Sequence, residues 1–299
     1  MIISLISQDC IDLFFICVSR DAIFTTFATI FIFIIGYLLN RLNEYRKEIK
    51  RLNDLEEYFY SLFELLKQPI NNQIVNLKEM ADNIDDKKKN QFPCKLNVDF
   101  DASNLLKITH SDLHKIFVVR KKGEIGTKTE RFANMTNALN YINFLKENIV
   151  VDYQNYNNSF NQYVKLWTEA CQSIITRYDT FCHFNKKDKT PLSNDKFLYD
   201  LDKLIFNWSQ YEDSKNIYVT QEQFIIPLKG LCKQHHQDER ANTILQLVVA
   251  ANTAFDSIES TKKIYRDQYK ENAATLKSKF ESFESAIKYF RGENGKEQN

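Results

Sequence analysis

The feature that most constrains this chain is an uncharged apolar run near its start. Residues Ala22 to Leu39 (AIFTTFATIFIFIIGYLL) contain no Asp, Glu, Lys or Arg. As an α-helix, such a run extends about 27 Å, close to the ~30 Å of hydrocarbon in a bilayer. Helices that are apolar all round are uncommon in soluble domains. The run therefore predicts a transmembrane helix, which we place at residues 21–40.

A signal peptide and a buried core helix are the two alternative interpretations of this run. A cleaved signal peptide would begin with a basic segment and end at small residues, whereas this run lacks the first and is followed by Asn-Arg-Leu-Asn-Glu. A core helix of a soluble domain is the remaining alternative. The transmembrane helix explains the length and the complete absence of charge best.

The charges on either side of the run predict its orientation. Mostly acidic residues precede it: Asp9, Asp12, Arg20 and Asp21. Several cations follow it: Arg41, Arg46, Lys47, Lys50 and Arg51. Because cytoplasmic flanks carry an excess of Lys and Arg, we expect a single-pass protein of the cell inner membrane. Its N-terminus would lie outside, and its C-terminal domain would lie in the cytoplasm.

Residues 1–20 form a separate apolar segment that Asp9 and Asp12 interrupt. A second full span would carry two carboxylates into lipid, at about 2.5–3.5 kcal/mol each near the centre. We therefore expect an interfacial helix over residues 1–19. A more specific alternative is that this segment forms a re-entrant element or the rim of a pore.

One face of the span carries small and hydroxylated residues. The face is formed by Thr25, Thr29, Ile32 and Gly36. Such residues let transmembrane helices approach closely and hydrogen-bond across the interface. The face therefore indicates self-association, around a narrow polar pore in the most specific version. The alternative is that each Thr hydroxyl bonds to the carbonyl four residues earlier in its own helix.

Residues 41–89 predict juxtamembrane helices that resemble a coiled coil, because nothing breaks the helix after the span. Apolar residues recur at steps of three and four, with Glu56 at the one position that interrupts them. This stalk seam consists of Leu42, Tyr45, Ile49, Leu52, Phe59, Phe63 and Leu66. The same helix of other subunits, or later helices of the same chain, could cover it. Pro69 should kink or end the helix, with another following over about 71–84.

Residues 90–299 predict a cytosolic bundle of long helices, so the whole chain belongs to the all-α class. Only 6 Gly and 4 Pro are present, too few for the turns of a many-stranded β fold. Alternation at 96–100 allows a hairpin or an extended loop. Helices are expected at 112–120 behind a Ser111 cap, at 129–181, at 194–209, behind a Thr220 cap, and at 238–290.

The chain shows little sign of cofactor or metal chemistry. It has no Gly-rich phosphate loop, nucleophile elbow, HExxH or CxxC spacing. Cys232, His235 and His236 lie close together but lack a fourth ligand. A net charge of +1 provides no general attraction for nucleic acid, and the 6 scattered cysteines fit reduced cytosolic thiols. We expect no cofactor, no metal, no nucleic-acid partner and no enzymatic activity.

One short pattern suggests an enzymatic alternative. Arg177 and His183, six residues apart, resemble the R-x4–6-H motif of HEPN-type ribonucleases. In that family the His acts in proton transfer and the Arg steadies phosphate charge, usually across a dimer. The resemblance implies a membrane-tethered ribonuclease with these two residues as its catalytic pair.

The layout as a whole is similar to that of single-span membrane effectors of bacterial anti-phage systems of the abortive-infection type. A lone span, a continuous amphipathic stalk and a helical domain without catalytic motifs follow one another. The resemblance implies a homo-oligomer in the lipid bilayer. Its cytosolic domain would sense a ligand or partner protein, and its spans would perturb or permeabilise the membrane. A passive, membrane-anchored scaffold is the alternative.

Overall fold

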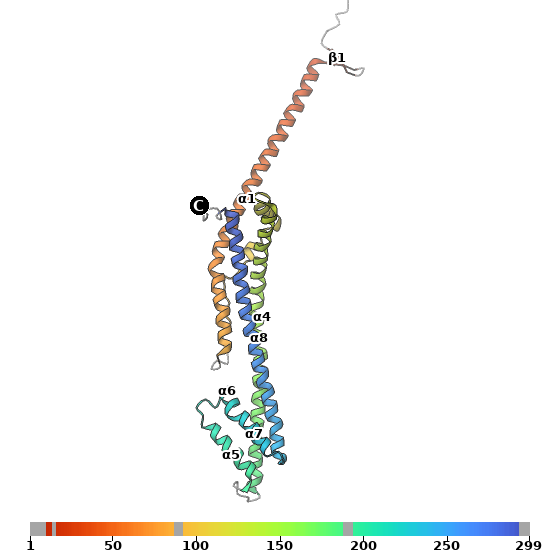
Figure 1. Ribbon diagram of the computed structural model, residues 1–299. Helices are drawn as coiled ribbons and strands as arrows, with labels where there is room; N and C mark the ends of the chain where they lie inside the picture. The colour runs from red at the N-terminus through yellow and green to blue at the C-terminus, as the bar shows by residue number, and fades with distance from the viewer. Residues whose placement is uncertain (1–9, 14–15, 87–91, 188–193, 293–299) are drawn as a thin grey trace, which may run out of the picture. The chain divides into compact units, whose positions relative to one another are not determined.

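The computed structural model describes residues 10–13, 16–86, 92–187 and 194–292 (Figure 1). Apart from one pair of short strands, the regular elements in these ranges are helical, which confirms the all-α prediction. The long helices are α1 (Arg20–Asp85), α4 (Ile125–Lys187) and α8 (Glu239–Arg291). The shorter helices are α2 (Ser103–Leu106), α3 (His110–His114), α5 (Lys196–Ser209), α6 (Ile217–Thr220) and α7 (Ile226–Gln234), and the π-helices η1 (Lys115–Val119) and η3 (Gln221–Ile225).

The first described residues form strands rather than the expected interfacial helix. β1 (Cys10–Leu13) and β2 (Ile16–Ser19) pair in antiparallel register. The helix prediction is wrong for these eight positions. Three of them, Ile11, Ile16 and Val18, are β-branched, and branching at Cβ favours the extended backbone over the helix. Residues 1–9 and 14–15, which the same prediction included, lie outside the described residues.

The helix that starts after β2 runs much further than Pro69. α1 contains this proline and continues to Asp85, so a separate helix over 71–84 does not exist. Proline removes one backbone donor but does not prevent a helix from continuing when packing holds both sides. Pro69 and the neighbouring Ile70 are both buried, which supplies that packing.

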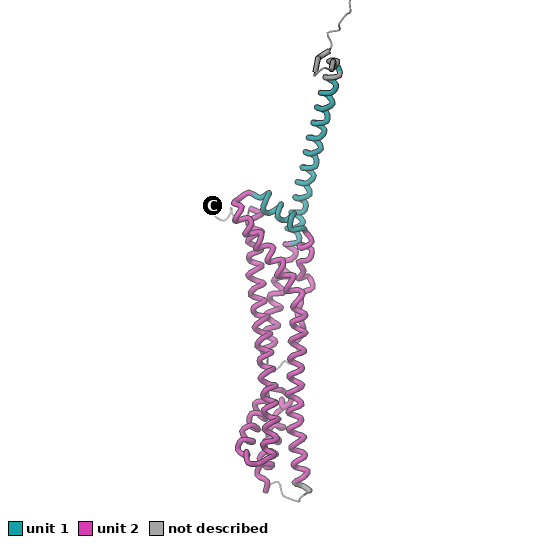
Figure 2. The backbone as a smooth tube through the Cα atoms, turned by 90° about the vertical axis from the view of Figure 1, so that its right-hand side faces the viewer, with its two compact units in different colours: residues 1–62, 109–121 teal, residues 63–108, 122–299 magenta. Residues whose placement is uncertain are grey.

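Contacts divide the chain into two compact units, coloured in Figure 2. Unit 1 comprises Met1–Leu62 and Thr109–Lys121. Unit 2 comprises Phe63–Ile108 and Lys122–Asn299. α1 contributes residues to both units.

Unit 1 is held together where the α3–η1 segment packs on α1. The ring of Phe117 lies 5.1 Å from Phe59 and 5.9 Å from Tyr60, both edge-on. The cap of α3 lies two residues before the predicted one, because the Thr109 hydroxyl, rather than Ser111, accepts the hydrogen bond from the Asp112 amide. A threonine with extended backbone, as here, is a favourable N-cap.

Unit 2 is built on α4 and α8, which lie side by side in antiparallel directions (Figure 1). Three hydrogen bonds fix this direction: Arg131 to Ser285, Tyr141 to Asn272, and Gln268 to Asp152. The second part of α1 joins them, as Phe63 packs at 4.7 Å against Phe283. α8 ends at Gly292, whose φ of +74° is readily adopted by glycine. The predicted helix over 238–290 is thereby confirmed.

The alternating segment at residues 96–100 is an extended loop rather than a strand, within what the sequence allowed. Its backbone pairs with a side chain in place of another strand. The buried Gln73 donates from Nε2 to the Lys95 carbonyl at 3.1 Å and accepts from the Asn97 amide at 2.8 Å. One amide side chain therefore satisfies two backbone groups that a neighbouring strand would otherwise bind.

Towards the C-terminal end of α4, α5 packs beside α4 and α7, and α7 packs beside α8 (Figure 1). Asp195 caps α5, and Asn216 caps α6 by accepting from the Tyr218 amide at 2.8 Å. The predicted Thr220 cap is wrong, because the helix has already begun at Ile217. The Thr220 hydroxyl instead donates to the Ser214 carbonyl at 2.7 Å.

Candidate functional site

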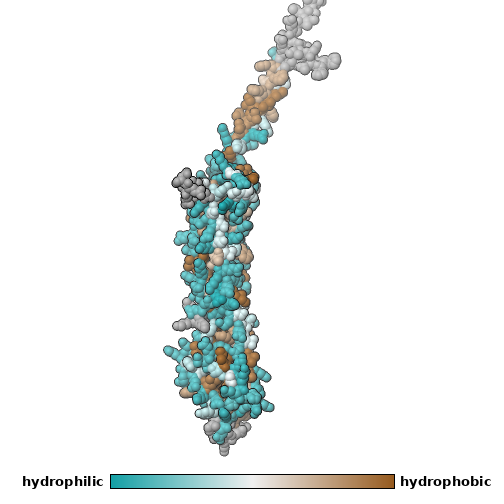
Figure 3. Space-filling model, in the orientation of Figure 1, coloured by the Kyte–Doolittle hydropathy of each residue, from teal (hydrophilic) through white to brown (hydrophobic). Residues whose placement is uncertain are grey.

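The first candidate site is the apolar part of α1, which the described chain does not cover. Figure 3 shows hydrophobic side chains gathered on this helix. No residue of its most apolar 18-residue window is buried, and the side chain of Phe24, for example, is 76% exposed. By length and composition, this is the one helix among the described residues that could cross a membrane.

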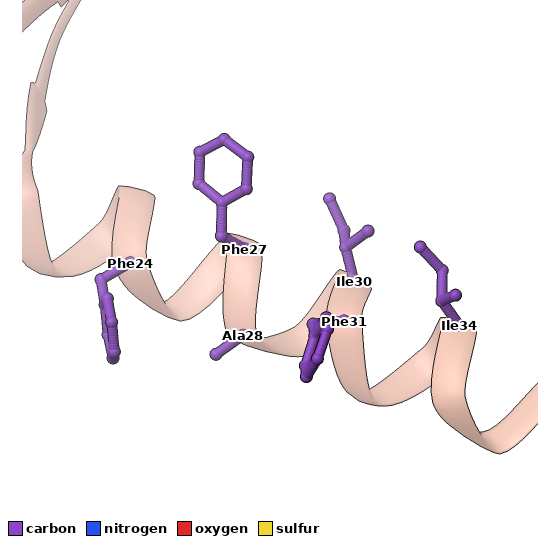
Figure 4. Close-up of a pocket in the computed structure, with 6 residues that line it drawn as sticks. All are labelled: Phe24, Phe27, Ala28, Ile30, Phe31 and Ile34. Atoms are coloured by element: carbon purple, nitrogen blue, oxygen red, sulfur yellow. The ribbon is translucent and has the colours of Figure 1, made fainter.

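Two faces of this helix differ in the size of their side chains. Figure 4 shows the bulky face, along which Phe24, Ala28 and Phe31 line one side of a shallow groove, and Phe27, Ile30 and Ile34 line the other. At 100° per residue, the predicted stripe of Thr25, Thr29, Ile32 and Gly36 lies on a different side. The helix can therefore present bulky or small side chains to a partner, depending on its rotation.

The threonines of the small-residue stripe bond within their own helix. Thr25 Oγ1 donates to the Asp21 carbonyl at 2.6 Å, and Thr29 Oγ1 donates to the Thr25 carbonyl at 2.8 Å. This is the geometry of the alternative considered from the sequence. Each hydroxyl oxygen can still accept a hydrogen bond. A Cβ added to Gly36 would meet nothing within 4 Å, so the surface there is open to close approach.

The stalk seam changes from exposed to buried along its length. Leu42 and Tyr45 are 54% and 63% exposed, and Ile49 is half-buried. Leu52, Phe59, Phe63 and Leu66 are at most 4% exposed. The chain itself thus covers the second part of the seam. Among the described residues, nothing buries Leu42 and Tyr45.

The seam also begins earlier than the sequence analysis placed it. Apolar residues recur every seven positions from the span into the buried region: Phe24, Phe31, Leu38, Tyr45, Leu52, Phe59 and Leu66. Residues four positions after each, such as Ile35 and Phe63, complete the 3–4 spacing of a coiled coil. Within the span this signal is hidden, because nearly every residue is apolar. The exposed and buried parts therefore share one heptad register.

Glu56, the one polar residue that interrupts the seam, has an ion-pair partner in unit 1. Lys121 Nζ lies 2.5 Å from Glu56 Oε1, and both side chains are largely shielded from solvent. A partly buried carboxylate is tolerated when a cation pairs with it. The interruption is therefore where the segment following η1 docks, a contact that the helical pattern alone does not predict.

Nearer the apolar part of α1, charged side chains add to the contact of α1 with α3 and η1. Arg51 lies 2.7 Å from Asp112 and 2.8 Å from Glu48, and Lys115 lies 3.3 Å from Glu48. The hydrogen bond from Arg51 is the largest cause that lowers the pKa of Glu48, to about 2, and it also lowers the pKa of Asp112. Because these groups are solvent-exposed, the ion pairs orient the segment more than they stabilise it.

The proposed ribonuclease pair is not brought together within one chain. Arg177 and His183 both lie exposed on α4. Six residues of α-helix separate them by about 9 Å along the axis and about 240° around it. Tyr178, between them, donates a hydrogen bond to Asp202 of α5. A joint role for the pair would require a second chain.

The Cys232, His235 and His236 cluster does not gather as metal ligands. Cys232 is fully buried in α7, and burial raises the pKa of its thiol to about 11. His235 Nε2 instead lies 3.2 Å from Asp200. No group of three His, Cys, Asp or Glu side chains suited to a metal ion is found among the described residues.

The second candidate site is a cavity of about 730 Å³ in unit 2, which sequence reasoning missed. It lies among α4, α5, α6 and η3, and Trp167 and Trp208 are part of its wall. Trp208 stacks on Phe224 of η3, with ring centroids 4.7 Å apart. π-helices often occur at functional sites. Pro227, which cannot donate to the Gln223 carbonyl, is the local reason for the wider turn.

The two tryptophans were the available signal for this cavity, since the chain contains no others. They lie 41 positions apart, on helices whose pairing the sequence pattern does not reveal. A second, more polar pocket of about 430 Å³ is lined by Tyr218, Glu259 and Lys262, among others. There Lys262 donates to the Tyr218 hydroxyl at 2.7 Å, and that hydroxyl donates to Glu259 at 2.6 Å. Each of these three polar groups has a hydrogen-bond partner within the protein, as is typical of a structural network.

Neither the apolar helix nor the cavity can be assigned by likeness to another protein. Function must therefore be argued from the geometry above. Comparison of the chain with protein-family models, with curated proteins and with solved structures gives no match.

Proposed function

We propose that this chain is a membrane-anchored, oligomeric, non-enzymatic effector, similar in role to the anti-phage effectors that its layout resembles. A helical sensor in its C-terminal part would control the spans, which then perturb or permeabilise the bilayer. One observation carries the proposal. The heptad face that is buried from Leu52 onward continues, uncovered, through Tyr45 and back to Phe24.

The case for the bilayer is one of free energy. Ten large aliphatic or phenylalanine side chains of the apolar part of α1 are substantially exposed: Phe24, Phe27, Ile30, Phe31, Ile32, Phe33, Ile34, Ile35, Leu38 and Leu39. Fully burying each is worth about 1.5–3 kcal/mol and about 60% of each is exposed on average, so leaving all of them in water forgoes about 9–18 kcal/mol. That is comparable to the total stability of a typical domain, about 5–15 kcal/mol. Lipid tails remove this cost.

The case for self-association concerns the short region that lipid tails would not reach. Leu42 and Tyr45 follow Arg41 and precede Arg46, so they would lie in or beyond the headgroups. Apolar side chains at these two heptad positions have no cover in the described chain. The same helix of another subunit, in parallel orientation, presents a matching seam. We therefore place the subunit interface on this face of α1.

Sidedness follows from the cations beside the span. Arg41, Arg46, Lys47 and Lys50 are all exposed. Exposed cations next to the span favour the cytoplasmic side of the inner membrane. The part of unit 1 that follows the span, and the whole of unit 2, would then face the cytoplasm, where a ligand or partner protein can reach them.

Control of the span requires an element with two states. A ligand shifts an equilibrium only if it binds one arrangement better than the other. α1 belongs to both units, so a rearrangement of either one can alter its rotation or spacing in the oligomer. We expect a helix-breaking Gly-Pro insertion near Arg46 to abolish activation without preventing membrane insertion. Full activity of the insertion variant would contradict direct transmission along α1.

The proposal is tested by dye release from vesicles that contain the purified full chain and self-quenched carboxyfluorescein. A bivalent antibody against a C-terminal tag brings subunits together, and its monovalent Fab fragment is the matched control. We expect release with the antibody and none with Fab. We also expect Tyr45→Ala to reduce release and Tyr58→Ala, an exposed tyrosine off the heptad face, to leave it unchanged. No release under clustering would favour the passive scaffold.

A further inference from the structure

We propose that the cavity among α4, α5, α6 and η3 binds a small aromatic carboxylate, with its ring against the tryptophan-lined wall and its carboxylate beside Lys215. The inference concerns unit 2 alone and does not depend on what the span does in a membrane. It rests on the size of the cavity, on the bonding state of its polar groups and on the single charge in its lining.

The size and walls of the cavity suit a small organic molecule. Its volume of about 730 Å³ lies within the roughly 300–1,000 Å³ of ligand pockets. Trp167, Trp208, Phe224 and Ile217 supply aromatic and aliphatic surface. Aromatic walls favour a flat ring, because offset and edge-on ring contacts add to simple burial. An extended peptide or a nucleic acid would need a longer groove than this.

The indole donors are already used by the protein. Trp167 Nε1 donates to Gln221 Oε1 at 3.2 Å, and Trp208 Nε1 donates to Thr220 Oγ1 at 3.3 Å. Gln221 is itself held in place, since its Nε2 donates to Asn252 at 2.6 Å. A ligand ring therefore meets the walls without leaving any buried donor unpaired, which would cost about 1–3 kcal/mol.

The threonine hydroxyls of the wall are occupied in the same way. Thr168 donates to the Val164 carbonyl at 2.8 Å, and Thr176 donates to the Gln172 carbonyl at 3.0 Å. These hydroxyls have no spare donor for the hydroxyl groups of a sugar or another polyhydroxylated ligand. The body of the ligand must therefore be largely apolar.

The charge in the lining selects the other end of the ligand. Of the thirteen described residues that line the cavity, Lys215 is the only charged one, and no carboxylate is among them. Lys215 is exposed, and no ion pair of its ammonium group is recorded among the described residues. A single cation beside apolar walls complements a monoanion. Phosphoryl groups of higher charge are usually held by several donors or an Arg cluster.

The test uses the fact that both tryptophans of the chain line this cavity. The full chain in detergent is titrated with 4-nitrobenzoate, whose nitro group quenches an indole on contact. Its neutral isostere 4-nitrobenzamide is the control for the charge. We expect saturable quenching by the anion with an unchanged fluorescence lifetime, which indicates a bound complex. We expect the amide to bind more weakly.

Two substitutions separate the ring site from the charge site. Lys215→Gln should weaken 4-nitrobenzoate about two- to fivefold, the range of an exposed ion pair, and leave the amide unchanged. Lys203→Gln, an exposed lysine of α5 that does not line the cavity, should change neither. Cys171→Phe should fill the space and abolish saturation for both probes. Because this variant could disturb folding, displacement of the quencher by phenylacetate in the unaltered chain is the parallel measurement.

Three results would overturn the inference. Linear quenching with a proportionally shortened lifetime would mean that the probes only collide with the indoles, and no site exists. Equal affinity for the acid and the amide, unaffected by Lys215→Gln, would remove the carboxylate from the proposal. Failure of phenylacetate to restore the fluorescence would exclude a shared aromatic site. Each outcome leaves the question of membrane release untouched.

Discussion

Two alanine substitutions on α1 test whether one heptad face serves two purposes. Phe59 and Tyr45 lie two heptads apart in the same register, but Phe59 is 0% exposed and Tyr45 is 63% exposed. Phe59→Ala removes a ring that contacts Phe117 edge-on at 5.1 Å. Truncating a buried Phe costs about 3–5 kcal/mol, including the cavity that it leaves. Tyr45→Ala leaves no cavity within the chain, so its effect on folding should stay within about 0.5 kcal/mol.

The assay has two readouts on the full chain in a mild detergent. Far-UV circular dichroism during guanidinium titration gives the free energy of unfolding, and the mass of the protein–detergent complex gives the oligomeric state. We expect Phe59→Ala to lower the unfolding free energy by about 3–5 kcal/mol. We expect Tyr45→Ala to leave it unchanged while shifting the population towards monomer. Tyr58→Ala, at another exposed position of α1, is the matched control and should affect neither.

The reasoning fails if the two readouts do not separate in this way. A stability loss for Tyr45→Ala comparable to that of Phe59→Ala would mean that the chain itself covers the first part of the seam. An unchanged oligomer with Tyr45→Ala would place the subunit interface elsewhere. A monomeric unaltered chain would exclude any pore formed by this lone span.

Further outcomes follow from other parts of the chain. If the bulky face forms the interface, oxidation should crosslink Phe31→Cys subunits beyond the unaltered background and Thr29→Cys subunits much less; the reverse pattern would favour the threonine stripe. Hydrogen bonding to Lys146 lowers the pKa of Asp101 from 3.8 to about 2, so its contribution to stability is present above pH 4 and is lost as the pH falls towards 2. Asp101→Asn should accordingly destabilise at pH 7 and match the unaltered chain near pH 2 in thermal unfolding. His183→Ala should leave every cellular phenotype intact, and a lost phenotype with a normally folded variant would revive the ribonuclease alternative.

Sequence reasoning worked where one strong local signal decided the outcome. The apolar run and the long 3–4 spacing gave an all-helical chain with one long apolar helix near the N-terminus. Gly292 and Asp238 marked the ends of α8, because a left-handed glycine and a side-chain cap are local requirements. Gly123 lies just before α4, where φ is +119° and a Cβ would approach the Tyr289 hydroxyl to 2.7 Å, so glycine is required there.

The errors occurred where packing or a competing residue outweighed the local signal. Thr220 and Ser111 are good caps by type, but Asn216 and Thr109 stand earlier and start the helices first. Pro69 does not end its helix, which continues to Asp85, so the separate helix expected after it is absent. In each case the residue type favoured the predicted helix boundary, but another residue or contact set the boundary that is observed.

The aromatic cavity and the ion pair of Glu56 are not visible in the sequence for a different reason. Each depends on residues from helices that meet only after folding, such as Trp167 on α4 and Trp208 on α5. A periodic pattern tells which face of a helix is buried, but not which helix covers it. The site residues that could be predicted are therefore those of a single helix, as on α1.

The covering of the seam changes between Ile49 and Leu52, one turn before Glu56, so the two parts of α1 can differ in how firmly they are held. From Leu52 onward, burial within the chain fixes the rotation of the helix about its axis. Before Leu52, ion pairs of Arg51 with Asp112 and of Glu48 with Lys115 tie α1 to the α3–η1 segment within unit 1, and such surface pairs contribute little to stability. A small change in the α3–η1 segment can therefore free or fix the exposed seam without unfolding the core around Phe59. Under the proposed function, a signal from unit 1 would therefore act on α1 before Leu52, ahead of the Glu56–Lys121 pair.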